Sequence, residues 1–198
     1  MSTLDELFDG VRVLMIMRGL DPEAAVARAE AAWTAGVPLV EVTIGTPDAV
    51  KSLRAVVEAG RQRGQVVGAG TVTSTDAVRA AADAGAVFTV APGLDADVLR
   101  ASLDAGLPHL PGIATPTELH RAVQLGCRWV KVFPSNSLGP AWFAAVRGPF
   151  PDVRFVATGG VTPETAPAFF AAGVAAVGIG AQTADPAALA ELARTAGI

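Results

Sequence analysis

One lysine of this chain stands in the middle of an apolar run. In the segment RWVKVFPSN, Lys131 is flanked by aromatic and β-branched residues, in the pattern of a buried strand. The only other lysine, Lys51, lies in the helical pattern AVKSLRAV, where it would face water. Burying an ammonium group costs free energy unless the group is paired or gives up its proton. The position of Lys131 therefore indicates a special role.

One carboxylate occupies a comparable place. Glu41 interrupts the apolar run LVEVTI and is the only acidic residue inside a predicted strand. A buried ion pair with Lys131 would be a weak source of stability, because desolvation offsets most of the attraction. Alternatively, a desolvated lysine supplies a free amine that condenses with a keto group, while a nearby carboxylate moves protons. We favour this second, catalytic explanation.

Other chemistries find little support in the chain. His109 is placed at the start of a predicted strand and His120 in the middle of a predicted helix, and there is no tyrosine. Cys127 precedes a strand and is expected to be a small packing residue. Histidines, cysteines and carboxylates nowhere show a metal-ligand spacing. We expect no metal and no cofactor.

Two glycine pairs indicate an anion site. ATGGVTPET places Gly159 and Gly160 between a strand and a helix, and VGIGAQ places Gly178 and Gly180 at the end of the next strand. Exposed backbone N–H groups next to a helix N-terminus bind phosphate or carboxylate. Glycine also serves ordinary turns, so the argument depends on the two pairs occurring on adjacent strands.

Strands and helices alternate along the chain. Helical stretches end in Ala-Gly or a similar pair, and a β-branched run follows each of them. The predicted strands span residues 11–17, 39–44, 66–71, 88–93, 108–113, 129–134, 154–159 and 175–180. Each is followed by a helical pattern, often opened by an N-cap or a proline. Eight such units favour a parallel (β/α)₈ TIM barrel, and an open doubly wound sheet is the alternative. With no linker pattern, we expect residues 1–198 to form a single domain.

Composition excludes several functional classes. Of 198 residues, 51% are hydrophobic and 17% charged, but no apolar run approaches the length of a membrane span. A net charge of −4 with scattered basic residues argues against nucleic-acid binding. The segment MSTLDELFDG lacks the plan of a signal peptide, and a single cysteine fits a reducing compartment. We expect a cytoplasmic protein whose partner is a small molecule.

Seven segments, in chain order, resemble the KDPG/KHG aldolases, class I enzymes that cleave 2-keto-3-deoxy-6-phospho sugar acids. They are VEVTIGTPDAV, VVGAGTV, FTVAPGL, LPGIATPTEL, WVKVFPSNSLGP, FVATGGVTPET and AVGIG, between about residues 11 and 182. The resemblance implies the barrel fold, a homotrimer and cleavage of a keto acid to pyruvate and an aldehyde such as glyceraldehyde 3-phosphate.

The resemblance also assigns roles to particular residues. It implies that Lys131 forms the Schiff base, that Glu41 transfers protons and that Thr71 contacts the substrate carboxylate. Further positions are expected to shape the pocket: Thr43, Pro92, Phe133, Pro134 and Ser135. The phosphate loops would contain Gly159, Gly160, Gly178, Ile179 and Gly180.

The chain departs from the family pattern at two places. Gly45 stands where the phosphogluconate branch has a carboxylate-binding arginine, and Ala181 where a phosphate-binding serine is usual. LMIMRGL resembles the phosphogalactonate branch, which has an arginine at the position of Arg18. We therefore expect Arg18 to bind the substrate carboxylate, and the alanine leaves open whether the substrate is phosphorylated.

The predicted activity is that of a Schiff-base aldolase. The alternatives are a cofactor-free isomerase or epimerase of a phosphorylated sugar, with Glu41 as base, and a ligand-binding barrel without turnover. The sequence leaves undetermined the choice among gluconate-, galactonate- and hydroxyglutarate-type keto acids, the C4 stereochemistry and the physiological direction.

Overall fold

Strands and helices alternate in the computed structural model, which describes residues 3–182 and 185–196. The strands are β1 (Val13–Met17), β2 (Leu39–Thr43), β3 (Val67–Gly70), β4 (Thr89–Val90), β5 (His109–Leu110), β6 (Gly112–Ile113), β7 (Trp129–Val132), β8 (Arg154–Thr158) and β9 (Ala176–Gly180). The helices are α1 (Leu4–Leu7), α2 (Pro22–Thr34), α3 (Pro47–Arg63), α4 (Thr75–Asp83), α5 (Ala96–Asp104), α6 (Pro116–Gln124), α7 (Ser135–Leu138), α8 (Pro140–Arg147), α9 (Ala166–Ala171) and α10 (Pro186–Thr195).

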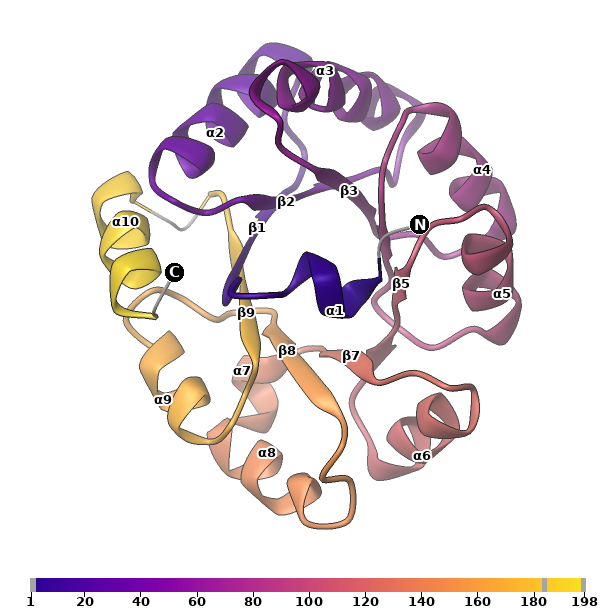
Figure 1. Cartoon of the computed structure of the whole chain (residues 1–198), viewed down its shortest axis with the longest axis vertical. Coiled ribbons are helices and arrows are strands. Elements are labelled where there is room, and N and C mark those ends of the chain that lie inside the picture. Colours follow the sequence, from indigo (N-terminus) through magenta and orange to yellow (C-terminus); the bar gives the residue numbers. More distant parts are fainter. Residues whose placement is uncertain (1–2, 183–184, 197–198) are drawn as a thin grey trace.

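All the paired strands are parallel, in the order β5-β4-β3-β2-β1-β9-β8-β7-β6. β5 and β6 are two halves of the predicted strand 108–113, separated by Pro111, which has no N–H to donate. This segment closes the ring, because Thr89 N donates to Pro108 O at 3.0 Å on one side and Lys131 N to Pro111 O at 2.8 Å on the other. Helices surround the ring in Figure 1. The predicted (β/α)₈ barrel is confirmed.

Side chains on each strand alternate between two cores. Phe88, Val90 and Leu110 belong to the cluster inside the barrel, whereas Val42 and Val130 pack between the strands and the surrounding helices. This alternation follows from the period of two in a β-strand. Strand residues two apart, such as Trp129 and Lys131 on β7, therefore both face the barrel interior.

The N-terminal helix α1 lies across one end of the barrel (Figure 1) and is absent from the sequence prediction. Its Thr3 and Glu6 form a capping box. Phe8 stacks on Trp129 with ring centroids 4.6 Å apart, and Trp129 Nε1 donates to Asp5 Oδ1 at 2.9 Å. Because Trp129 begins β7, α1 closes the amino end of the barrel, opposite the end where parallel-barrel active sites lie.

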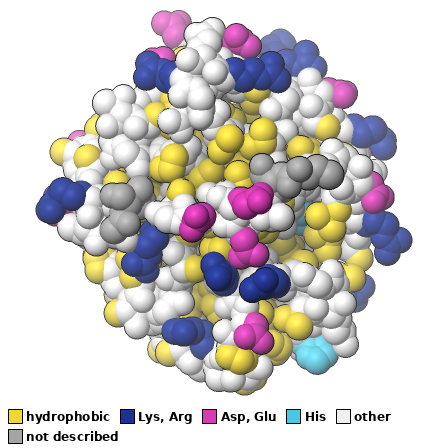
Figure 2. Space-filling model, viewed as in Figure 1, with side chains coloured by type: hydrophobic (Ala, Val, Ile, Leu, Met, Phe, Trp, Pro, Cys, Tyr) yellow, Lys and Arg dark blue, Asp and Glu magenta, His cyan; other side chains and the backbone are white. Residues whose placement is uncertain are grey.

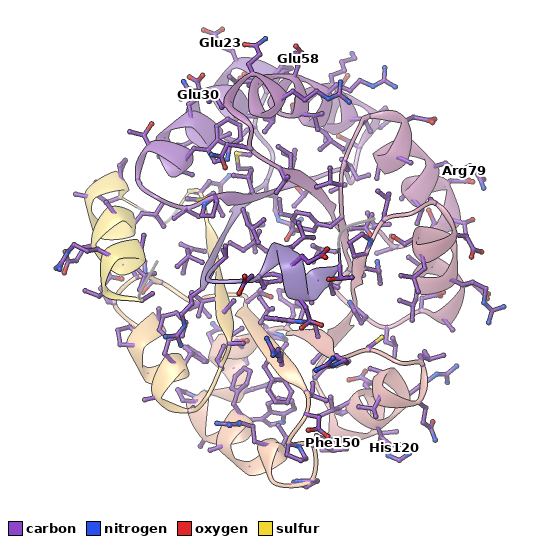
Figure 3. All side chains as sticks on the ribbon, in the orientation of Figure 1. Glu23, Glu30, Glu58, Arg79, His120 and Phe150 are labelled. Carbon is purple, nitrogen blue, oxygen red and sulfur yellow. The ribbon has the colours of Figure 1, made fainter. Side chains whose placement is uncertain are left out.

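The surface around α1 is charged. Arg128 and Arg154 lie 3.8 and 3.7 Å from the two carboxylate oxygens of Asp5, and Figure 2 shows basic and acidic side chains together in the middle of this face. Charged side chains also project outward from the surrounding helices, as Figure 3 shows for Glu23, Glu58 and Arg79. No helix in the described part of the chain is long and apolar enough to cross a membrane.

Candidate active site

Lys131 lies inside the barrel and only 6% of its surface is exposed. β7 positions it, with Gly112 of β6 as its neighbour in register. Its Nζ lies 5.7 Å from the centroid of the Phe133 ring, two residues further along the chain. The aromatic ring supplies a weakly attractive, largely apolar environment for the amine.

Glu41 on β2 is fully buried, and neither carboxylate oxygen has a hydrogen-bond partner among the described residues. The carboxylate packs against Gly70 of β3 so closely that a Cβ at that position would overlap it. In the described part of the chain, Glu41 and Lys131 have no ion pair within 4.0 Å with each other or with another residue. The stabilising ion pair between Lys131 and Glu41 is therefore not formed. A buried carboxyl group normally has a hydrogen-bond partner, and a substrate group can serve as one here.

Arg18 and Thr71 meet at the carboxyl end of the barrel. Arg18 follows β1, Thr71 follows β3, and Arg18 Nη2 donates to Thr71 Oγ1 at 3.4 Å. Thr71 has a φ of 57°, which is rare for a β-branched residue. Such strained positions concentrate at functional sites. The guanidinium and the hydroxyl together provide donors for a carboxylate.

A cavity of about 220 Å³ opens at the same end. Its lining contains Lys131 and Arg18, the two cationic side chains expected in the site, together with both glycine pairs. The complete lining is Ile16, Arg18, Lys131, Phe133, Thr158, Gly159, Gly160, Val161, Thr162, Gly178 and Gly180. The cavity therefore joins the predicted Schiff-base lysine to the predicted anion loops.

The loop after β8 is shaped by two glycines with left-handed backbone, φ 86° at Gly159 and 75° at Gly160. A Cβ at Gly159 would lie 2.7 Å from the Phe133 ring, and one at Gly160 would lie 2.5 Å from the Asn136 side chain. Both the backbone angles and these contacts require glycine. As a result, the backbone of this loop reaches the cavity directly.

A family model decides where the chain belongs. The model of the KDPG and KHG aldolases matches residues 4–194. The chain belongs to this aldolase family. It is therefore a lyase of the KDPG/KHG aldolase type, and the family resemblance seen in the sequence is confirmed.

Named aldolases resemble the chain over most of its length. It is 35% identical to 2-dehydro-3-deoxy-6-phosphogalactonate aldolase of Escherichia coli K12 over 169 residues, which are 85% of this chain and 82% of that protein. Identity to the 2-dehydro-3-deoxy-phosphogluconate aldolase of Pseudomonas aeruginosa is 38% over 164 residues, with 81% and 73% coverage. The chain is therefore similar to enzymes of both branches.

A solved aldolase provides a chemical parallel. KDPG aldolase from Legionella pneumophila, which holds pyruvate as a covalent carbinolamine, superposes on this chain with a TM-score of 0.86. The two sequences are 27% identical, and the match covers 100% of this chain and 99% of that one. A carbinolamine is the first covalent adduct of an amine with a ketone, as expected for a Schiff-base aldolase.

The remaining positions singled out by the aldolase resemblance do not line this cavity, and neither do Glu41 and Thr71. Thr43 is 5% exposed at the end of β2, Pro92 follows β4, and Pro134 follows a cis peptide bond. Ser135 is fully buried. Ile179 is fully buried in the outer core, so only its backbone remains for anion binding.

Four cavity residues are missing from the aldolase site inferred from the sequence: Ile16, Thr158, Val161 and Thr162. Ile16 is an apolar residue of β1 and Thr158 a weakly polar residue of β8, and Thr162 lies in the loop that follows β8. Alternation could have found the first two, because β1 and β8 place them on the inner face. The position of Thr162 depends on the path of a loop.

Both histidines lie outside this site. His120 packs edge-on against Phe150 with centroids 6.4 Å apart, on the outer side of the barrel (Figure 3). His109 Nδ1 lies 2.7 Å from Thr89 Oγ1, and burial lowers the pKa of its imidazole to about 4. Among residues 3–182 and 185–196, no group of three His, Cys, Asp or Glu side chains is arranged to hold a metal.

Proposed function

We propose that this aldolase cleaves a 2-keto-3-deoxy sugar acid through a Schiff base on Lys131. Two observations carry the proposal: a buried lysine lies in the wall of a cavity, and a fully buried carboxyl group has no hydrogen-bond partner among the described residues. A lysine amine in the wall of a cavity can attack the ketone of a substrate bound there. An unpaired carboxyl group can accept and return a proton.

The proposed reaction begins with attack of Lys131 Nζ on the C2 carbonyl, which gives a carbinolamine and, after loss of water, an iminium ion. Glu41, directly or through a water molecule, removes the proton of the C4 hydroxyl. The C3–C4 bond then breaks, its electron pair passes into the enamine, and the C4 oxygen becomes an aldehyde. Protonation of C3 and hydrolysis release pyruvate and the free lysine.

Arg18 and the two glycine loops in the cavity lining provide two anion-binding groups that would orient the substrate. Arg18 and Thr71 would hold the C1 carboxylate, since a guanidinium forms strong charge-assisted hydrogen bonds with it. The glycine loops of β8 and β9 would hold the distal end of the substrate. Thr43, Pro92, Phe133 and Pro134 would shape the space between.

We propose a phosphorylated sugar acid as substrate, with glyceraldehyde 3-phosphate as the aldehyde product. The named relatives are a 2-dehydro-3-deoxy-6-phosphogalactonate aldolase and a 2-dehydro-3-deoxy-phosphogluconate aldolase. In this chain a phosphate would rely on backbone N–H groups, because Ala181 offers no hydroxyl. We therefore expect a smaller preference for the phosphorylated form than a loop with a serine would give.

Pyruvate release tests this function. Gluconate-, galactonate- and hydroxyglutarate-type 2-keto acids, with and without a 6-phosphate, are incubated with the protein, and pyruvate is measured through lactate dehydrogenase. Release from at least one of them is expected. Exchange of substrate protons with solvent, with no pyruvate from any of them, would instead identify an isomerase or epimerase.

We further propose that the enzyme is a cytoplasmic homotrimer. The trimer is implied by the family resemblance, and one similar chain belongs to a protein cage designed from symmetric oligomeric domains. Large apolar side chains such as Leu103 (51% exposed) leave surface for association. Sedimentation equilibrium should give three times the chain mass of 20.0 kDa, and a monomer would contradict the proposal.

A further inference from the structure

The hydrogen-bond ladder between β7 and β8 is interrupted just above Lys131. Arg154 N donates to Arg128 O at 2.8 Å, which sets the first rung. In a parallel pair the rungs from one strand recur every second residue, so Thr158 N would be expected to donate to Val132 O. Instead, Thr158 N donates to the hydroxyl of Ser135 at 3.0 Å.

Ser135 replaces the missing rung. Its Oγ donates to Val132 O at 2.8 Å, so the serine hydroxyl connects the donor on β8 to the acceptor on β7. Thr158 Oγ1 also donates to Val132 O, at 3.3 Å. The single hydroxyl hydrogen of Ser135 is used, its oxygen accepts a bond, and the residue is fully buried. Ser135 therefore has no free donor to offer to a substrate.

The inserted hydroxyl separates two strand ends that carry parts of the cavity wall. Phe133 follows β7 and Gly159 follows β8, and both line the cavity together with Thr158. Asn136, next to Ser135, donates its N–H to Gly159 O at 3.0 Å, which fixes the loop to α7. A direct rung in place of the hydroxyl would bring these strand ends closer together.

We propose that Ser135 is a positioning residue, a spacer in the β7–β8 ladder that sets the width of the cavity above Lys131. The inference rests on the proposed function and changes the role of this residue from pocket contact to spacer. The part of the substrate affected is the chain beyond C3, because the carboxylate-binding groups Arg18 and Thr71 follow β1 and β3, which do not pair with β7 or β8.

The test is the Ser135→Ala variant, which removes the spacer hydroxyl and leaves Thr158 N to pair directly with Val132 O or to stay unpaired. The matched control is Ser137→Ala, because Ser137 is exposed in the same helical turn and has only one long side-chain bond, at 3.4 Å to Asn136. Both variants are assayed for pyruvate trapping by borohydride and for cleavage of the best six-carbon substrate.

For Ser135→Ala we expect kcat/KM for the six-carbon substrate to fall about 10-fold or more, mainly through KM, with pyruvate trapping changed less than about twofold. Deuterium exchange at the Thr158 amide should also differ from the wild-type rate, because this amide loses its acceptor on Ser135. Ser137→Ala should match the wild type, and Ser135→Thr, which keeps the hydroxyl, should recover most of the activity. If Ser135→Ala does not fold, Ser135→Cys, which has a weaker acceptor, takes its place with the same expectation.

Unchanged cleavage in the Ser135 variant, or an equal loss of trapping and cleavage, would overturn the spacer role. A wild-type protein that is not trapped by pyruvate at all would be a failure of the proposed function itself. In that case the exchange rate at Thr158 still reports whether the hydroxyl replaces the ladder bond, so the two failures are distinguishable.

Discussion

The carboxylate of Glu41 occupies the space in which the side chain of residue 70 would otherwise lie. Gly70 is the partner of Thr43 in the β2–β3 register. Because glycine has no side chain, the space next to Thr43 on β3 is free for the buried carboxylate of Glu41. Gly70 thereby leaves room for the Glu41 carboxylate, which has no hydrogen bond from any described residue.

Gly70→Ala is expected to displace the Glu41 carboxylate and to lower kcat about 100-fold or more, because general acid–base catalysis contributes about 10²–10⁴-fold. Steady-state pyruvate release measures the effect. Gly45→Ala, just after the end of β2, is the control, since a Cβ there meets nothing within 4 Å. Equal kcat values in the two variants would contradict a role for Glu41 in the proton-transfer step.

Arg18→Gln should weaken binding of the substrate carboxylate. Hydrogen bonds to charged groups contribute roughly 1.5–3 kcal/mol, which corresponds to a rise in KM of about 10- to 150-fold. Steady-state kinetics at fixed ionic strength measure the change. Arg28→Gln on the exposed side of α2 is the control and should leave KM unchanged. A wild-type KM in Arg18→Gln would assign carboxylate binding to other groups.

His109 should make the fold sensitive to acid. Burial lowers the pKa of its imidazole from 6.5 to about 4, while the charge of Asp95 acts in the opposite direction. Between these pH values the unfolded chain binds more protons than the folded one, so stability is full above pH 6.5 and is lost as the pH falls toward 4. The loss is about 3 kcal/mol at most.

Urea unfolding at several pH values checks this expectation. His109→Gln should flatten the dependence of the free energy of unfolding on pH between about 6.5 and 4, whatever its effect on absolute stability. His120→Gln is the matched control, because that imidazole is exposed, and it should keep the wild-type slope. A steep slope retained in His109→Gln would place the acid sensitivity elsewhere.

Asp5 should stabilise the barrel through α1. Asp5→Ala removes the acceptor of Trp129 Nε1 and leaves a partly buried donor unpaired, which costs about 1–3 kcal/mol. Chemical denaturation measures the free energy of unfolding. Asp9→Ala, an exposed acid just beyond α1, should cost little. Similar losses in both variants would indicate a general effect of net charge instead.

The repeating pattern of helix-ending glycine and β-branched run was sufficient to predict the barrel, because each repeat contains the local signals of one strand and one helix. Local sequence signals did not predict the elements that depend on contacts between distant parts of the chain. α1 forms because Phe8 and Asp5 meet Trp129, more than a hundred residues away, and the strand at 108–113 is divided at Pro111, which cannot donate to the ladder.

For the site, residue type and position identified Lys131 and Glu41, since a charged residue inside an apolar strand can be recognised from the sequence alone. The spacer role of Ser135 cannot be recognised from the sequence, because it depends on the register between two strands and on the turn into α7. The outward direction of Ile179 follows from alternation along β9, which a family motif does not express.

The central claim is that the amine of Lys131 bonds to a ketone. The protein is incubated with pyruvate and sodium borohydride, digested and analysed by peptide mass spectrometry, with Lys51→Ala and Lys131→Ala in parallel. We predict a reduced pyruvate adduct on Lys131 in the wild type and in Lys51→Ala, and none in Lys131→Ala. Labelling of Lys131→Ala equal to that of the wild type, or no adduct in the wild type, would contradict the account.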